Sequence, residues 1–155
     1  MTSQQFGNVS RLLHSQVQGV LATWSTNTRR PATHLMAFGF RQDLTHIFLA
    51  TSLHTVKATN IHTCPAVSML WDDRTGKLSD HGDGMLVTMS GTATILPAAG
   101  AVEARSRFLE ANPNMEAFLQ DANTAMVGVR VEEYAVVVGY GQAEQWSPVQ
   151  CDAAL

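Results

Sequence analysis

Residues 45–73, THIFLATSLHTVKATNIHTCPAVSMLWDD, carry the pattern around which the other segments are arranged. The apolar run 47–49 is typical of a buried strand, and a polar turn follows it. A short helix is expected to end near Thr63, and Pro65 precedes a second apolar run, 67–70. The predicted order is therefore strand, polar turn, short helix, strand.

The polar turn combines hydroxyl groups with a lysine, in Thr51, Ser52, Thr55 and Lys57. Hydroxyls at a strand end, free N–H groups in a first helical turn and an ammonium group suit a phosphate. The alternative interpretation is that the hydroxyls only cap the helix and that Lys57 is solvated. The segment lacks the glycine-rich loop that makes a phosphate motif specific.

Composition limits the possible classes of protein. A chain of 155 residues with 45% hydrophobic content is expected to form one domain, 1–146, with a C-terminal tail, 147–155. A net charge of -3, with only 10 Lys and Arg, argues against nucleic-acid binding. Cys64 and Cys151 have no CxxC spacing, so neither a metal site nor a redox pair is predicted.

The ends of the chain and its apolar runs predict no membrane association. No run approaches the roughly 20 apolar residues that span a bilayer, and MTSQQFGNVSRLL lacks the features of a signal peptide. We therefore expect a cytoplasmic protein.

Hydrophobic periodicity predicts an amphipathic opening helix, 4–17, and a mainly β remainder. The chain is expected to finish with two strands, 125–132 and 134–141, after a late helical excursion. Six strands with this helical decoration predict an antiparallel barrel. The strand 31–41 is apolar on both faces, which indicates burial on each side or contact with a ligand or second subunit. Gly91 is a predicted bulge.

The charged loop after Trp71, DDRTGKLSDHGDG, is the segment expected to be most mobile. Its four aspartates suggest calcium, but neither register supplies both the glycine and the terminal glutamate of an EF-hand. A solvated hairpin loop is the favoured interpretation.

Three segments together resemble the flavin-binding split-barrel family that includes pyridoxamine 5'-phosphate oxidases. They are GVLAT at 19–23, FLATSLHTVKATNI at 48–61 and CPAVSMLW at 64–71, in the family's order and spacing. Two later segments, RFLEANPNMEAFL at 107–119 and VVVGYGQAEQW at 136–146, are similar to the haem-utilisation branch of that superfamily.

The resemblance implies a homodimer of six-stranded antiparallel split barrels with two FMN sites at the interface. Thr51 and Ser52 would contact the phosphate and ribityl chain, and Thr55 and Lys57 would hold the phosphate. The isoalloxazine would lie along the backbone of Thr33, His34, Leu35 and Met36.

The chain also departs from the family pattern. Val56 and Thr33 stand where the family commonly has arginines, and Leu86 stands where it has a glutamine. Lys57 is then the one certain cation for a phosphate, and Arg29, Arg30 and Arg74 are candidates for a second. These departures weaken any assignment of pyridoxamine phosphate as substrate.

The predicted function is that of an FMN-dependent oxidoreductase acting on an unidentified small molecule. His34 is a candidate proton donor, with a packing role as the alternative, and Tyr140 and Trp146 are candidates for a lid over the ring. The alternatives are a haem-binding or haem-degrading protein and a relative that binds the deazaflavin F420. All six histidines lie at or before His81, so no C-terminal histidine is available for haem.

Overall fold

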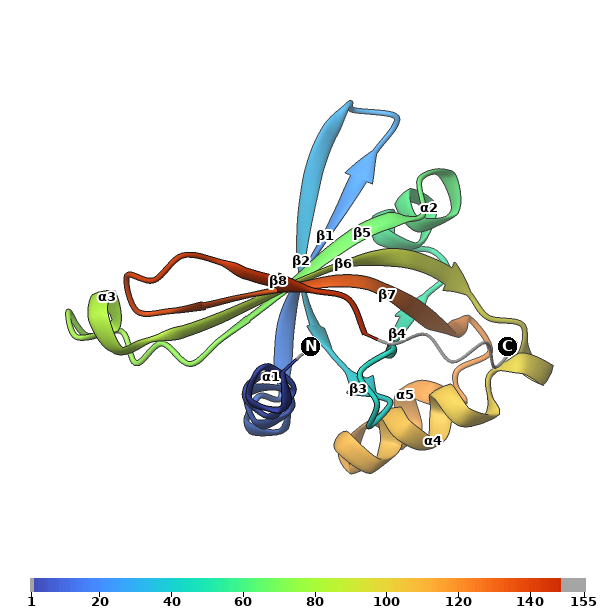
Figure 1. Cartoon of the computed structure of the whole chain (residues 1–155). Helices are drawn as coiled ribbons and strands as arrows, with labels where there is room; N and C mark the ends of the chain where they lie inside the picture. Colours follow the sequence, from blue (N-terminus) through green and yellow to red (C-terminus); the bar gives the residue numbers. More distant parts are fainter. Residues whose placement is uncertain (1, 149–155) are drawn as a thin grey trace.

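A computed structural model of the chain describes residues 2–148, and the last seven residues of the predicted tail, Cys151 among them, lie outside this range. The described residues form one antiparallel sheet of eight strands with helices at its margins (Figure 1). The strand order is β2-β1-β5-β6-β7-β4-β3, and β8 pairs with β7. In chain order the elements are α1 (Ser3–Ser15), β1 (Gln18–Ser25), β2 (Arg30–Ala37), β3 (Gly39–Phe40), β4 (His46–Ser52), α2 (Val56–Thr63), β5 (Ala66–Asp72), α3 (Asp80–Asp83), β6 (Met85–Ile95), η1 (Ala98–Gly100), α4 (Val102–Ala111), η2 (Pro113–Met115), α5 (Glu116–Gln120), β7 (Thr124–Val138) and β8 (Glu144–Trp146).

The sheet curls because one segment of the chain belongs to both of its ends. β2 lies at one end of the strand order and β3 at the other, and only Phe38 separates them. Phe38 is 3% exposed, and its ring lies 5.3 Å from that of Trp71. The predicted split barrel is thus confirmed, but the sheet has eight strands in place of the predicted six, and the strand expected over 31–41 is two strands.

The end of the chain differs from the expected pair of strands. The two strands expected over 125–132 and 134–141 are a single strand, β7, which pairs with β6 over residues 127–138. The register shifts at Ser90 and Gly91, so that Glu132 is skipped while Glu133 pairs with Ser90. The bulge predicted at Gly91 is confirmed. It accommodates Glu132 and Glu133 within one continuous strand.

The main core lies inside the curled sheet, and α1 covers part of it. Thr2 and Gln5 form a capping box at the start of α1. Its buried side chains, Val9, Leu12 and Leu13, pack with strand residues such as Met69 and Val129. The predicted amphipathic opening helix is confirmed.

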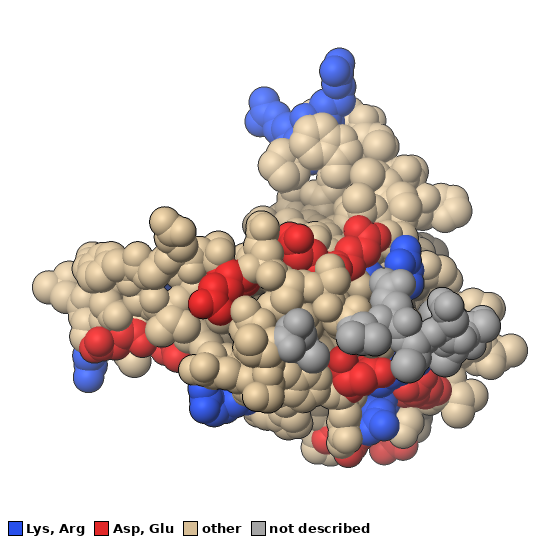
Figure 2. Space-filling model, viewed as in Figure 1, with Lys and Arg blue, Asp and Glu red and all other residues tan. Residues whose placement is uncertain are grey.

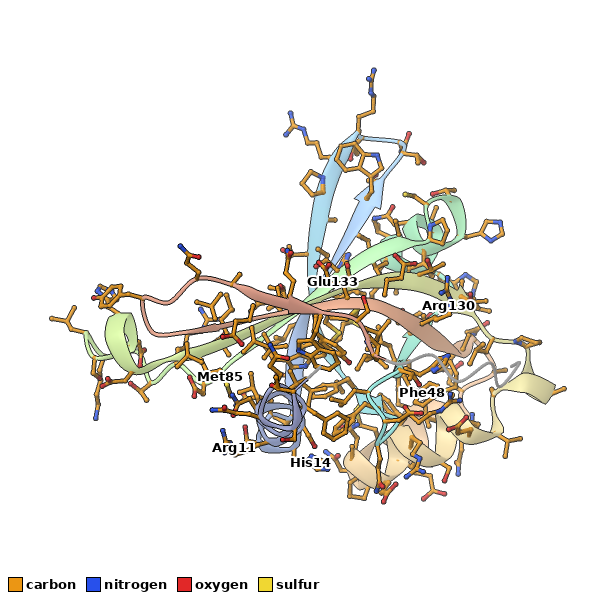
Figure 3. All side chains as sticks on the ribbon, in the orientation of Figure 1. Arg11, His14, Phe48, Met85, Arg130 and Glu133 are labelled. Carbon is orange, nitrogen blue, oxygen red and sulfur yellow. The ribbon has the colours of Figure 1, made fainter. Side chains whose placement is uncertain are left out.

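A second, smaller core lies between the sheet and the late helices. Phe48 on β4 packs there with Phe108 on α4 and Leu119 on α5, on the side of the sheet where these helices lie (Figure 3). Asn112, 6% exposed, ends α4 and donates to the carbonyl of Phe38 at 2.9 Å. The helical excursion therefore supports the point where the sheet closes.

The charged loop between β5 and β6 folds on itself around Asp80. The carboxylate of Asp80 accepts from the backbone N and hydroxyl of Thr75 and from the backbone N of Gly76, at 2.7–2.9 Å. These bonds lower the pKa of Asp80.

Among residues 2–148, no helix is long and apolar enough to cross a bilayer.

Candidate functional site

The hydroxyl-rich corner forms where β4 ends and α2 begins. Thr55 caps the helix, its Oγ1 accepting from the backbone N of Ala58 at 3.3 Å and donating to the carbonyl of Ser52 at 2.8 Å. The hydroxyl of Thr51, 2% exposed, lies 3.0 Å from that of Thr55. Thr55 therefore caps the helix, and both threonine hydroxyls have partners inside the protein.

Ser52 and Lys57 retain groups with which an anion can interact. Within residues 2–148, the Ser52 hydroxyl has one partner, the backbone N of His54 at 3.4 Å, so its proton is free to be donated. Lys57 is half-buried in the first turn of α2 and makes no salt bridge to a carboxylate of the described chain. The corner thus offers one hydroxyl donor and one uncompensated ammonium group.

A buried hydrogen-bond chain connects the helix of this corner to β2. Asn60 on α2 donates from Nδ2 to the Thr23 hydroxyl on β1 at 3.0 Å, and that hydroxyl lies 3.1 Å from Nε2 of His34. Thr23 and Asn60 are each 3% exposed. Burial lowers the pKa of His34, and the charge of Lys57 lowers it further. His34 and Lys57, predicted from separate segments, are therefore electrostatic neighbours.

Thr23 and Asn60 are functional candidates that the sequence reasoning missed. Both lie inside segments that carry the family resemblance, 19–23 and 48–61. A signal was present, since Thr23 occupies the inward phase of a strand otherwise lined by residues such as Leu21. A polar residue in that phase needs a buried partner.

The four predicted ring-contacting residues do not share one face. Leu35 pairs with Val20 and is 64% exposed, whereas Met36 is 6% exposed. Thr33 is exposed with Leu35, and His34 is half-buried on the side of Met36. What the four share is the backbone of β2, which in the described chain pairs with β1 alone.

The outer side of the sheet carries a cross-strand row of small and apolar side chains. Neighbouring pairs connect Leu35 to Val20, Val20 to Leu70, Leu70 to Thr88, and Thr88 to Ala135. We call this row the outer face. No residue of the row is buried within the single chain.

Two open hollows flank Leu70 on the outer face. One, of about 300 Å³, is lined by Val20 and Leu35, and the other, of about 340 Å³, includes Leu86. Both include the Asp72–Arg74 ion pair, whose atoms lie 2.7 Å apart. Leu86, at the position of the family's glutamine, therefore lines a hollow of this face.

The candidates for a second cation lie elsewhere. Arg29 and Arg30 are exposed at the tip of the β1–β2 hairpin, where Figure 2 shows basic side chains projecting from the molecule. Arg74 is bound to Asp72, at the end of β5 opposite to the end that follows α2. None of the three makes a hydrogen bond or ion pair with the corner in the described chain, whereas the charge of Lys57 acts on His34.

The remaining aromatic and histidine candidates separate by environment. His54 bonds Asn123 through Nε2 at 3.2 Å, and His62 is exposed. Trp146 is 7% exposed and lies 4.8 Å from the ring of Tyr134, which makes it a core residue. Tyr140 is 83% exposed on the hairpin after β7.

Comparison with known proteins agrees with this architecture. The sequence profile described as pyridoxamine 5'-phosphate oxidase matches residues 7–138. The chain belongs to this family. No match was found among curated proteins.

Three solved structures share the fold with this chain at low sequence identity. A haem binding protein from Mycobacterium smegmatis is 18% identical with a TM-score of 0.81, and the alignment covers 96% of this chain and 60% of that one. ChuZ from Campylobacter jejuni is 14% identical, with a TM-score of 0.78 and coverages of 95% and 61%. A FAD-binding protein from Mesorhizobium loti is 13% identical, with a TM-score of 0.66 and coverages of 88% and 94%.

Two of these similar proteins are considerably longer. The chain spans about three fifths of the length of the haem binding protein and of ChuZ. Two of the three neighbours are described as binding haem or FAD, and the likeness to all three establishes the fold.

Proposed function

We propose that the protein binds FMN and transfers electrons between the flavin and a small molecule. The observation that carries the proposal is the uncompensated ammonium group of Lys57 at the start of α2, beside the free donor of Ser52. A phosphate carrying close to two negative charges gains from both groups and from the positive end of the helix. When bound, the flavin supplies the redox chemistry, and the chain supplies the orientation of its ring.

The edge of β2 is the proposed place for the ring. Its backbone groups, from Thr33 to Met36, lack a second strand partner in the described chain. A flat and mostly apolar ring needs apolar walls with a few aimed hydrogen bonds, and an edge strand beside exposed Leu35 offers both.

The second wall of the site would come from another copy of the chain. The outer face exposes Leu35 beside half-buried Val20 and Leu70, and it is continuous with the edge of β2. A continuous apolar sheet face of this kind is typical of an interface between subunits. We therefore propose a homodimer with the cofactor at the interface.

Haem is the second candidate ligand, because a neighbour with a TM-score of 0.81 is described as a haem binding protein. A haem site needs an axial ligand such as histidine. Within the described chain Nε2 of His34 and Nδ1 of His46 each have a protein partner, whereas His62 and His81 are exposed.

Spectroscopy of the purified protein separates these candidates. We expect FMN to bind with quenched fluorescence, and more tightly than riboflavin, because only FMN carries the phosphate. Lys57→Ala should remove most of that difference, whereas Lys77→Ala, an exposed lysine on the β5–β6 hairpin, should retain it. A haem Soret band without flavin binding would favour the second candidate, and equal binding of FMN and riboflavin by the wild type would refute the phosphate assignment.

A further inference from the structure

We propose that Asn60 and Thr23 hold His34 in the tautomer protonated on Nδ1, so that this N–H binds the cofactor phosphate beside Lys57. The inference rests on the proposed function for its ligand. It assigns the second phosphate-binding group to a neutral histidine rather than to an arginine.

The direction of the hydrogen bonds follows from the donors available. The Asn60 amide nitrogen only donates, so the Thr23 oxygen accepts at 3.0 Å. Thr23 has one proton left, and the acceptor within reach is Nε2 of His34 at 3.1 Å. Because Thr23 is 3% exposed, a proton directed elsewhere would lack a partner. His34 then accepts at Nε2 and carries its own proton on Nδ1.

The position of His34 connects it with the phosphate end of the site. Through Thr23, His34 is tied to Asn60, one turn along α2 from Lys57. The charge of Lys57 and burial both lower the pKa of His34, which keeps the ring neutral near pH 7. A neutral N–H donor next to an ammonium group adds a hydrogen bond for an anion without adding charge repulsion.

Anion binding should then be coupled to protonation. A phosphate dianion opposes the effect of Lys57, and so it raises the pKa of His34. In the described chain, the groups that act on the His34 imidazole are Lys57 from α2, Thr23 from β1 and, through Thr23, Asn60. FMN binding should therefore raise the pKa of His34 in an NMR titration, and riboflavin binding should not.

The tautomer can be measured without any cofactor. In ¹⁵N-edited NMR of the wild-type protein, Nδ1 of His34 should be protonated, and Nε2 should be unprotonated and accept a hydrogen bond. Thr23→Val, which keeps the shape of the side chain but has no hydroxyl, should give a mixture of tautomers. Protonation at Nε2 in the wild type would overturn the proposal, because the Thr23 hydroxyl would then accept from His34 instead of donating to it.

Binding tests the role of the tautomer. His34→Ala should weaken FMN binding about tenfold and leave riboflavin binding unchanged, since a hydrogen bond to a charged group is worth about 1.5 kcal/mol or more. His34→Asn, which retains a nearby N–H, should recover part of the loss. His54→Ala is the matched control, because His54 lies beside the same corner and bonds Asn123 instead.

The outcomes separate this inference from the proposed function. Equal losses of FMN and riboflavin in His34→Ala would place the histidine at the ring and overturn the inference, with flavin binding intact. Failure of the wild type to bind FMN would remove the proposed function, and with it the ligand named here. Circular dichroism of each variant establishes that the barrel is folded.

Discussion

The hydroxyl of Tyr134 on β7 donates a 2.9 Å hydrogen bond to the carbonyl oxygen of Leu44, in the turn before β4. Leu44 has a φ of 62°, a left-handed conformation that is rare for a branched side chain. Burial raises the pKa of Tyr134, so the hydroxyl stays protonated. This bond thus fastens a strained turn to the core.

Tyr134→Phe should destabilise the protein by about 1–2 kcal/mol, because the Leu44 carbonyl loses its buried donor. Urea denaturation measures the change. Tyr140→Phe, at an 83% exposed position, is the control and should leave the midpoint unchanged. An unchanged Tyr134→Phe midpoint would show that the bond contributes nothing.

His46 should make the protein less stable as the pH falls below about 6.5. It is 7% exposed, and its Nδ1 lies 2.9 Å from Nη1 of Arg41, which also binds Glu103. Burial lowers the pKa of His46, and the charge of Arg41 lowers it further. The unfolded chain therefore binds this proton more readily, and stability is complete above its ordinary pKa and lost as pH falls toward the folded value.

His46→Gln tests that pH dependence. The variant should lose less of its melting temperature between pH 7 and pH 5 than the wild type does. The pKa of Glu103 is lowered from 4.5 by the Arg41 hydrogen bond, so its protonation acts below this window. His81→Gln, at an exposed position, should follow the wild-type profile. Parallel profiles for His46→Gln and wild type would contradict the assignment.

Gly91 and Gly7 should respond oppositely to replacement by alanine. A Cβ at Gly91 would collide with the Arg130 carbonyl across the bulge, so Gly91→Ala should destabilise by about 1–3 kcal/mol. A Cβ at Gly7, in α1, meets nothing within 4 Å, and Gly7→Ala should stabilise by about 0.5–1 kcal/mol. Thermal melting of both variants distinguishes steric from conformational effects.

Leu35→Arg should convert the proposed dimer to a monomer by placing a charge on the outer face. Light scattering after size exclusion gives the mass. Leu78→Arg, at an 85% exposed position on the β5–β6 hairpin, should remain dimeric. A dimer that persists in Leu35→Arg would move the interface to another surface.

Much of the fold could be predicted because its signals are local. The strand, turn and helix from Thr45 to Thr63 follow from adjacent residues, and so does the capping by Thr55. The division of 31–41 at Phe38 could not be predicted, because both parts have strand periodicity. It arises where the chain passes from one end of the sheet to the other.

The candidate site was predictable only in part, for a similar reason. Lys57 and the hydroxyls are neighbours in sequence, whereas Thr23 and Asn60 are 37 residues apart. A threonine in a strand is ordinary by propensity. Its role depends on α2 folding back against β1, and only the tertiary structure shows this.

Residues 30–40 run from one edge of the sheet to the other, so cofactor binding at one edge should be detectable at the other. Because β2 and β3 are joined through Phe38, anything that immobilises His34 at one margin also restrains Phe40, which pairs with Ile47 at the other. Amide exchange at Ile47 should therefore slow when the cofactor binds, although Ile47 is not one of the proposed ligand groups. Cofactor binding would therefore reduce the mobility of both edges of the sheet.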